Sequence, residues 1–258
     1  MVSRALTIAT SDSGGGAGIQ ADLKAFAAAG VHGSSVLGAL TAQYTREVTA
    51  IHQLPPEFIV AQLDAVFDDI GVDAAKTGML FSRTIIETVA VYLRDHPVPL
   101  VVDPVMVASS GASLLEEDAV DALVGRLFPL ATVVTPNLIE ARSLAGADGS
   151  PAELAERLHA LGAAAVIVTG GHGDISADHL FDGREHIDIS VEHHAVAATH
   201  GSGCTHSATL TELLARGLPL VEAAQGAADA ASRAVAHGLT ELGAGEGPVD
   251  VLELEAVR

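Results

Sequence analysis

The chain has 258 residues, of which 49% are hydrophobic and only 3% are aromatic. Its formal net charge of −20 argues against binding to nucleic acids or to anionic membrane surfaces, because both partners attract basic patches. The apolar residues are mainly Ala, Val, Leu and Ile, which suits the core of a parallel sheet covered by helices.

Strand-like and helix-like segments alternate along the whole chain. In chain order, the sequence predicts a strand at 5–10, a helix at 17–29, a strand at 34–41, a strand or solvent-facing flap at 47–54, a helix from the two prolines at 55–56 through 70, a strand at 74–77, a helix at 84–94, a strand at 100–102, a helix at 115–127, a strand at 132–135, helices at 138–144 and 151–161, a strand at 164–169, a hairpin at 180–189, helices at 204–216 and 220–237, and a looser tail at 238–258.

The short connections between these units predict one doubly wound sheet, and no Pro- or Ser-rich linker divides the chain. We therefore expect a single domain over residues 1–258. One cysteine excludes an internal disulfide. With neither a signal segment nor a run of 18 apolar residues, the expected location is cytoplasmic.

Polar or glycine residues stand where several predicted strands end. These positions are Asp12, Asp103, Asn137 and Gly170-Gly171. In open α/β sheets ligands bind at the carboxyl ends of the strands, so this edge is the expected site.

A glycine loop at residues 10–18 follows the first predicted strand. Residues 16–21 match the G-x-G-x-x-A dinucleotide fingerprint, but residues 31–46 contain none of the acidic residues that the fingerprint requires for the ribose. Neither lysine follows a glycine, which excludes a G-x-x-x-x-G-K-[ST] loop. The loop is interpreted as a close approach of backbone to a small ligand, with a purely structural turn as the alternative.

Four side chains in or near the predicted strands have more than one interpretation. Asn137 and Glu140 suit a hydrated Mg²⁺, with a helix N-cap and a first-turn acid as the alternative. Asp103 ends a buried strand and needs a partner, a metal or solvent. Lys76 lies in a strand, where a charge is unexpected, and fits a structural ion pair as well as a ligand.

The strongest local feature is the turn at residues 199–205, which runs into a helix and carries the chain's single cysteine, Cys204. The N–H groups of such a turn suit a bound phosphate, and the same pocket is expected to lower the pKa of the thiol. The turn would hold developing charge in phosphoryl transfer, and Cys204 would accept the proton of the acceptor hydroxyl. The alternative is a helix start with a small buried cysteine.

Assembled, these motifs resemble the hydroxymethylpyrimidine/phosphomethylpyrimidine kinases of thiamine biosynthesis, which are members of the ribokinase-like superfamily. The resemblance spans about residues 6–233, through LTIATSDSGGGAGIQADLK at 6–24, KTGML at 76–80, DPVMVASSG at 103–111, TPNLIEA at 135–141, GGH at 170–172 and HGSGCT at 200–205. It implies a three-layer α/β sandwich with a mostly parallel central sheet, helices on both faces, and a small β flap associated with a homodimer.

The resemblance also implies phosphorylation of 4-amino-5-hydroxymethyl-2-methylpyrimidine, and then of its monophosphate, with ATP and Mg²⁺. By position it implies an acceptor pocket in which Gln43 hydrogen-bonds the pyrimidine, with further contacts from the stretch Gly14–Gly18 and from Asp22, Thr41, Met79 and Val105. It places the anion hole and catalytic group at Gly201, Ser202, Gly203 and Cys204. It places ATP and its phosphates near Asp103, Asn137, Glu140, Thr169 and Gly171, with Asp103 and Glu140 reaching the metal through water.

Two departures from the family pattern remove positive charge near phosphate, because Ser109 and Thr169 stand where many relatives carry lysine. They weaken the expectation of the second phosphorylation. Three alternatives stay open: a pyridoxal kinase, a non-catalytic pyrimidine- or nucleotide-binding protein, and a Cys/His hydrolase built on Cys204 with His200 or His206.

Overall fold

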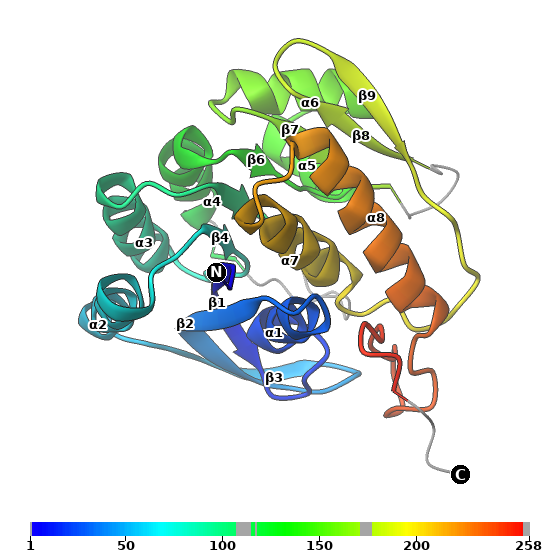
Figure 1. Ribbon diagram of the computed structural model, residues 1–258, viewed down its shortest axis with the longest axis horizontal. Coiled ribbons are helices and arrows are strands. Elements are labelled where there is room, and N and C mark those ends of the chain that lie inside the picture. The colour runs from blue at the N-terminus through cyan, green and yellow to red at the C-terminus, as the bar shows by residue number, and fades with distance from the viewer. Residues whose placement is uncertain (1, 107–114, 117, 171–176, 255–258) are drawn as a thin grey trace.

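The computed structural model describes residues 2–106, 115, 116, 118–170 and 177–254, and a nine-stranded sheet forms its central layer (Figure 1). The strand order is β3-β2-β1-β4-β5-β6-β7-β8-β9. The six central strands are parallel: β2 (His32–Gln43), β1 (Arg4–Asp12), β4 (Ala74–Thr77), β5 (Leu100–Val102), β6 (Val133–Val134) and β7 (Val166–Val168). Antiparallel strands complete both edges: β3 (Val48–Gln53), β8 (Ala177–Phe181) and β9 (His186–Ser190).

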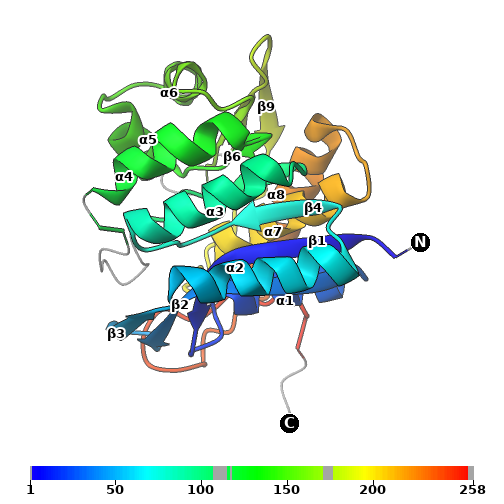
Figure 2. The same cartoon turned by 90° about the vertical axis from the view of Figure 1, so that its left-hand side faces the viewer.

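Helices cover both faces of this sheet, and Figure 2 shows the resulting layers. One face is covered by α1 (Gly18–Ala28), α7 (Ser202–Ala215) and α8 (Leu220–Ala236). The other face is covered by α2 (Pro56–Ala65), α3 (Arg83–Asp95), α4 (Ala119–Ala122), α5 (Leu138–Ala145) and α6 (Pro151–Ala160). The expected α/β sandwich with a mostly parallel sheet is confirmed.

Local sequence signals explain where several helices begin. Asn137 with Glu140, and Ser150 with Glu153, form reciprocal capping boxes at the starts of α5 and α6. Pro56 is the first residue of α2, where its missing N–H costs no helical hydrogen bond. The predicted helix through residue 70 is formed by α2 and, directly after it, by a π-helical turn, η1 (Val66–Ile70).

One predicted helix is shorter than expected. Within the predicted segment 115–127 the helix begins at Ala119, and ahead of it the Glu116 N–H bonds the carbonyl of Phe81 at 2.9 Å. The short α4 then continues as π-helical η2 (Leu123–Leu127) and 3-10 helical η3 (Phe128–Leu130).

The segment at residues 238–250, here called the C-terminal strap, has little regular structure but is docked on the body of the protein. Its Val249 N–H bonds the carbonyl of His200 at 3.0 Å. The Thr45 hydroxyl oxygen accepts hydrogen bonds from the N–H groups of Ala244 and Gly245. The strap therefore joins the start of α7 to the β2–β3 turn. Within the described ranges, no helix has the length and apolar character needed to cross a membrane.

Candidate active site

The carboxyl ends of the parallel strands bring the predicted polar residues to one edge of the sheet. Asp12 is the last residue of β1, Asp103 directly follows β5, and Asn137 lies between β6 and α5. Ser207 of α7 donates a 2.8 Å hydrogen bond to Asp103. This bond ties the sheet edge to the helix that follows the Gly201 turn.

A buried charge network lies beneath this edge, centred on Lys76 of β4. Its ammonium nitrogen lies 2.7 Å from Asp22 of α1, 2.8 Å from the hydroxyl of Ser207, and 3.7 Å from Asp103. Burial alone would lower the pKa of Lys76, but the carboxylates of Asp22 and Asp103 raise it above its usual value. Lys76 is therefore a permanent positive charge inside the protein, as the ion-pair alternative from the sequence predicted.

Asp22, which was expected to help form the acceptor pocket, has no exposed surface. One of its oxygens pairs with Lys76, and the other accepts a 2.5 Å hydrogen bond from Thr7. In this structure Asp22 can act on a substrate only through the Lys76 network.

The Gly201 turn is packed so tightly that only glycine fits at its first position. Gly201 has a φ of 85° and forms the N-cap of α7. A Cβ atom there would lie 1.9 Å from the carbonyl oxygen of Gly16. The first turn of α7 therefore lies directly against the glycine loop before α1, and the helix start favours negative charge at this place.

Cys204 lies in the first turn of α7, with its sulfur close to the start of α1. Burial, together with the carboxylates of Asp22 and Asp103, raises the pKa of the thiol to about 12, although the charge of Lys76 and the nearby backbone N–H of Gly18 act to lower it. The sequence-based expectation of a lowered pKa is wrong, because the helix start and a nearby cation do not offset the loss of water. Cys204 is a neutral thiol at physiological pH.

The two histidines considered for a Cys/His hydrolase have other partners. His200 Nε2 lies 3.4 Å from Asp12, and His206 Nε2 lies 3.1 Å from Asp178. The thiol is neutral, and both imidazoles lie beside carboxylates, although neither ring nitrogen of His206 makes a hydrogen bond to a described residue, so the geometry does not favour a nucleophilic Cys204.

The residues expected to bind the acceptor lie at the ends of β1, β2 and β4. The Thr41 hydroxyl contacts both the carbonyl of Ser11 and the side-chain oxygen of Gln43, at 3.0 and 3.2 Å. The Gln43 amide NH₂ group has no hydrogen-bond partner among the described residues. Met79 is buried, and its carbonyl accepts a bond from Thr10, whereas Val105 is half-buried beyond β5.

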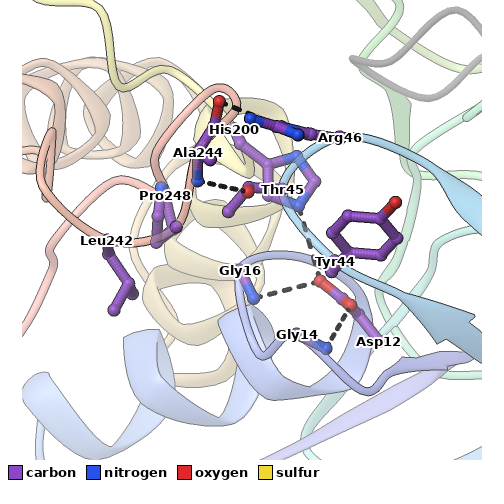
Figure 3. Close-up of a pocket in the computed structure, with 11 residues that line it drawn as sticks. Asp12, Gly14, Gly16, Tyr44, Thr45, Arg46, His200, Leu242, Ala244 and Pro248 are labelled. Atoms are coloured by element: carbon purple, nitrogen blue, oxygen red, sulfur yellow. Dashed lines mark hydrogen bonds and ion pairs between the residues drawn. The ribbon is translucent and has the colours of Figure 1, made fainter.

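A cavity of about 340 Å³ opens beside the glycine loop (Figure 3). It is bounded by the glycine loop, the β2–β3 turn, His200 and the strap, through Asp12, Gly14, Gly16, Tyr44, Thr45, Arg46, His200, Leu242, Gly243, Ala244 and Pro248. Of the residues expected to bind the acceptor, Gly14 and Gly16 line it. The roles of Gln43, Thr41, Met79 and Val105 stay predictions.

Asn137 and Glu140 are both engaged at the start of α5, where the Glu140 carboxylate accepts hydrogen bonds from the N–H groups of Asn137 at 3.0 Å and of Met106 at 3.4 Å. The Asn137 side-chain oxygen accepts hydrogen bonds from the N–H groups of Ile139 and Glu140, so it is occupied as a helix cap. Burial, together with the neighbouring charge of Asp103, raises the pKa of Glu140 to about 8. Two carboxylates that repel one another, with no all-protein cage among the described residues, fit a hydrated Mg²⁺ that takes its other ligands from water and phosphate.

The loop after β7 lies next to the start of α5. The backbone N–H of Thr169 bonds the carbonyl of Pro136, and the Gly170 N–H bonds Asp178 at 2.7 Å. Gly171 and Ser109, the other two positions discussed for phosphate, lie outside the described residues. The Asp178–His206 pair had no signal in the sequence, because its members are 28 positions apart on β8 and α7.

Comparison with known proteins agrees with this geometry. The phosphomethylpyrimidine kinase family model matches residues 12–250. The chain is 48% identical over 257 residues to the hydroxymethylpyrimidine/phosphomethylpyrimidine kinase of Rhizobium meliloti, covering 96% of this chain and 97% of that protein. It is 50% identical over 262 residues to the thiamine biosynthesis bifunctional protein ThiED of Geobacter sulfurreducens, covering 98% of this chain and 53% of that protein.

Among solved structures, an ADP complex of Bacillus subtilis pyridoxal kinase matches with a TM-score of 0.89 and 38% identity, covering 97% of each chain. The sequence and structural matches together show that the chain belongs to the phosphomethylpyrimidine kinase family and has the ribokinase-like fold.

Proposed function

We propose that this protein phosphorylates 4-amino-5-hydroxymethyl-2-methylpyrimidine, and then its monophosphate, with ATP as the phosphoryl donor in thiamine biosynthesis. The observation that carries the proposal is the meeting of two features at one sheet edge. The first is the glycine turn at the start of α7, with Cys204 in it. The second is the Lys76–Asp103 network, which reaches the same helix through Ser207.

In the proposed reaction, the acceptor hydroxyl oxygen forms a bond to the γ-phosphorus while the bond from that phosphorus to the β,γ-bridging oxygen breaks. ADP is the leaving group, and the hydroxyl proton is released as the new ester forms. The backbone N–H groups at Gly201, Ser202 and Gly203 would stabilise the negative charge on the transferred group. Such transition states are loose, so catalysis depends mainly on position and electrostatics.

The neutral thiol changes the role that we assign to Cys204. A group with a pKa of about 12 does not remove the acceptor proton in advance at neutral pH. We place Cys204 next to the acceptor hydroxyl, where its S–H and sulfur orient that group. Lys76 beneath it contributes a fixed, buried positive charge, and it is one of only two lysines in the chain.

For the metal, we propose that Asp103 and Glu140 hold Mg²⁺ through water. When bound, Mg²⁺ would neutralise charge on the phosphate oxygens. The same two carboxylates then lose their mutual repulsion.

The test is a coupled assay of ADP release with hydroxymethylpyrimidine, its monophosphate and pyridoxal in separate reactions at saturating Mg²⁺. We expect the highest kcat/KM with hydroxymethylpyrimidine and measurable turnover of the monophosphate. No turnover of either pyrimidine refutes the proposal. Pyridoxal is included because a pyridoxal kinase is a structural relative, and a higher kcat/KM with pyridoxal would favour that activity instead.

We also propose a homodimer formed through the β2–β3 flap. β3 is an edge strand, and Leu40 and Tyr44 of the flap region are 39% and 48% exposed. Light scattering coupled to size-exclusion chromatography would give twice the chain mass, and Leu40→Glu should shift it to the monomer.

A further inference from the structure

One side-chain contact joins the glycine loop to the Gly201 turn across 188 positions of the sequence. Figure 3 shows His200 beside Asp12, and Nε2 of His200 lies 3.4 Å from Oδ2 of Asp12. The two side chains are 13% and 4% exposed. Asp12 ends β1 at the start of the loop, and His200 immediately precedes Gly201. The contact therefore connects the acceptor side of the proposed site to its phosphate side.

Asp12 organises the glycine loop from within. Its Oδ1 accepts a bond from the Gly14 N–H at 2.8 Å, and its Oδ2 accepts bonds from the N–H groups of Gly16 and Ala17 at 3.0 and 2.9 Å. Burial alone would raise the pKa of Asp12, but His200 and these N–H groups hold it below its usual value. Asp12 is a carboxylate occupied by the loop itself, so its place in the site is structural.

The two glycine segments also interlock at backbone level. A Cβ atom on Gly16 would lie 2.4 Å from Cδ2 of His200, and a Cβ atom on Gly201 would lie 1.9 Å from the oxygen of Gly16. The imidazole thus lies directly on the glycine loop. The ring of His200 and the backbone of Gly201 therefore contact the same residue of the glycine loop.

The backbone of His200 is held from its other side by the strap. Its N–H bonds the carbonyl of Gly247 at 3.3 Å, and its carbonyl accepts the Val249 N–H at 3.0 Å. The neighbouring Thr199 hydroxyl bonds Glu246 of the same strap. His200 is therefore fixed by its backbone to the strap and by its side chain to Asp12.

We propose that His200 is a positioning residue that sets the register between the glycine loop and the Gly201–Cys204 turn, and so the distance between the acceptor hydroxyl and the phosphoryl group. The kinetic part of this inference rests on the proposed kinase function. A displacement of about 1 Å at reacting groups can cost about 10²-fold in rate, so a register defect should appear in kcat.

The first experiment needs no substrate. Because Cys204 is the only cysteine, its rate of alkylation by iodoacetamide in the folded protein reports how closely the turn is held against the glycine loop. We expect His200→Ala to raise this rate at least about tenfold, because the turn is no longer held in place. His200→Gln, which keeps an N–H donor, should restore a rate close to that of the wild type. His186→Ala is the matched control and should leave the alkylation rate unchanged. The imidazole of His186 also pairs with a carboxylate, that of Glu156, but His186 lies on the edge strand β9.

The second experiment measures kcat and KM for both substrates. We expect His200→Ala to lower kcat about 10- to 100-fold with KM changed less than about threefold, with rescue by His200→Gln. If His200→Ala does not fold, His200→Asn, which is too short to reach Asp12, replaces it. The proposal is overturned if the disrupting variant alkylates at the wild-type rate, or if His200→Gln fails to rescue. If the wild type has no kinase activity, the proposed function is refuted. The alkylation rates would still decide whether His200 sets the register between the glycine loop and the Gly201–Cys204 turn.

Discussion

Replacing Lys76 by Met tests whether the buried network is held together by this one charge. Lys76 is fully buried, and its ammonium pairs with Asp22 at 2.7 Å. Met has a similar volume and fills the same space, so the substitution removes the charge without leaving a large cavity. The carboxylate of Asp22 is then buried with Thr7 as its remaining hydrogen-bond donor.

The magnitude follows from the fate of that carboxylate. Removing one partner of a buried ion pair typically costs about 3–5 kcal/mol. Protonating Asp22 relieves the unpaired charge, and doing so at pH 7 from an ordinary pKa near 3.9 costs about 4 kcal/mol, which agrees with that range. A protonated Asp22 in the folded variant means that folding takes up a proton. The loss should therefore shrink by about 1.4 kcal/mol for each unit by which the pH falls from 7 toward 4.

Urea unfolding of the wild type and of Lys76→Met at pH 7 and pH 5 measures both quantities. The matched variant is Lys76→Met with Asp22→Asn, in which Asp22 is no longer a buried charge; Asp103, 3.7 Å from the same ammonium, loses its cation in both variants, so its contribution cancels between them. The double variant should regain about 2 kcal/mol or more over the single variant. A loss below about 1 kcal/mol at pH 7, or no recovery in the double variant, would refute the reasoning.

Three further predictions concern the site itself. With a pKa of about 12, Cys204 should react with iodoacetamide at pH 8 at least about 10²-fold more slowly than free cysteine, with the rate rising about tenfold per pH unit as thiolate forms; a titration midpoint below 9 contradicts this. Gly201→Ala adds a Cβ atom against Gly16 and should lower kcat about 10²-fold. Its control is Gly217→Ala, where the glycine has a similar φ of 83° but open space around it, and kcat should stay unchanged. Equal effects of the two variants on kcat would refute the steric argument. Glu140→Gln should raise the Mg²⁺ concentration for half-maximal activity about tenfold with little change in the unfolding midpoint, and an unchanged Mg²⁺ dependence would show that this carboxylate does not serve the metal.

The sequence by itself determined the order of strands and helices, because hydrophobic periodicity and Gly, Pro and capping residues act locally. It also determined which residues would meet at the carboxyl edge, since parallel strands align their ends. Asp12 and Asp103 could be placed there from their positions after apolar runs. The motif order likewise sufficed to identify the family, which the comparisons confirm.

Only the tertiary structure decided the contacts and charge states on which the site depends. Lys76 meets Asp22 across 54 positions, and Asp12 meets His200 across 188, so neither pair follows from local spacing. The pKa of Cys204 was predicted in the wrong direction, because it depends on a balance between burial and nearby charge. A helix start can be recognised in a sequence, but the amount of water excluded from a thiol depends on how α1 and α7 pack together.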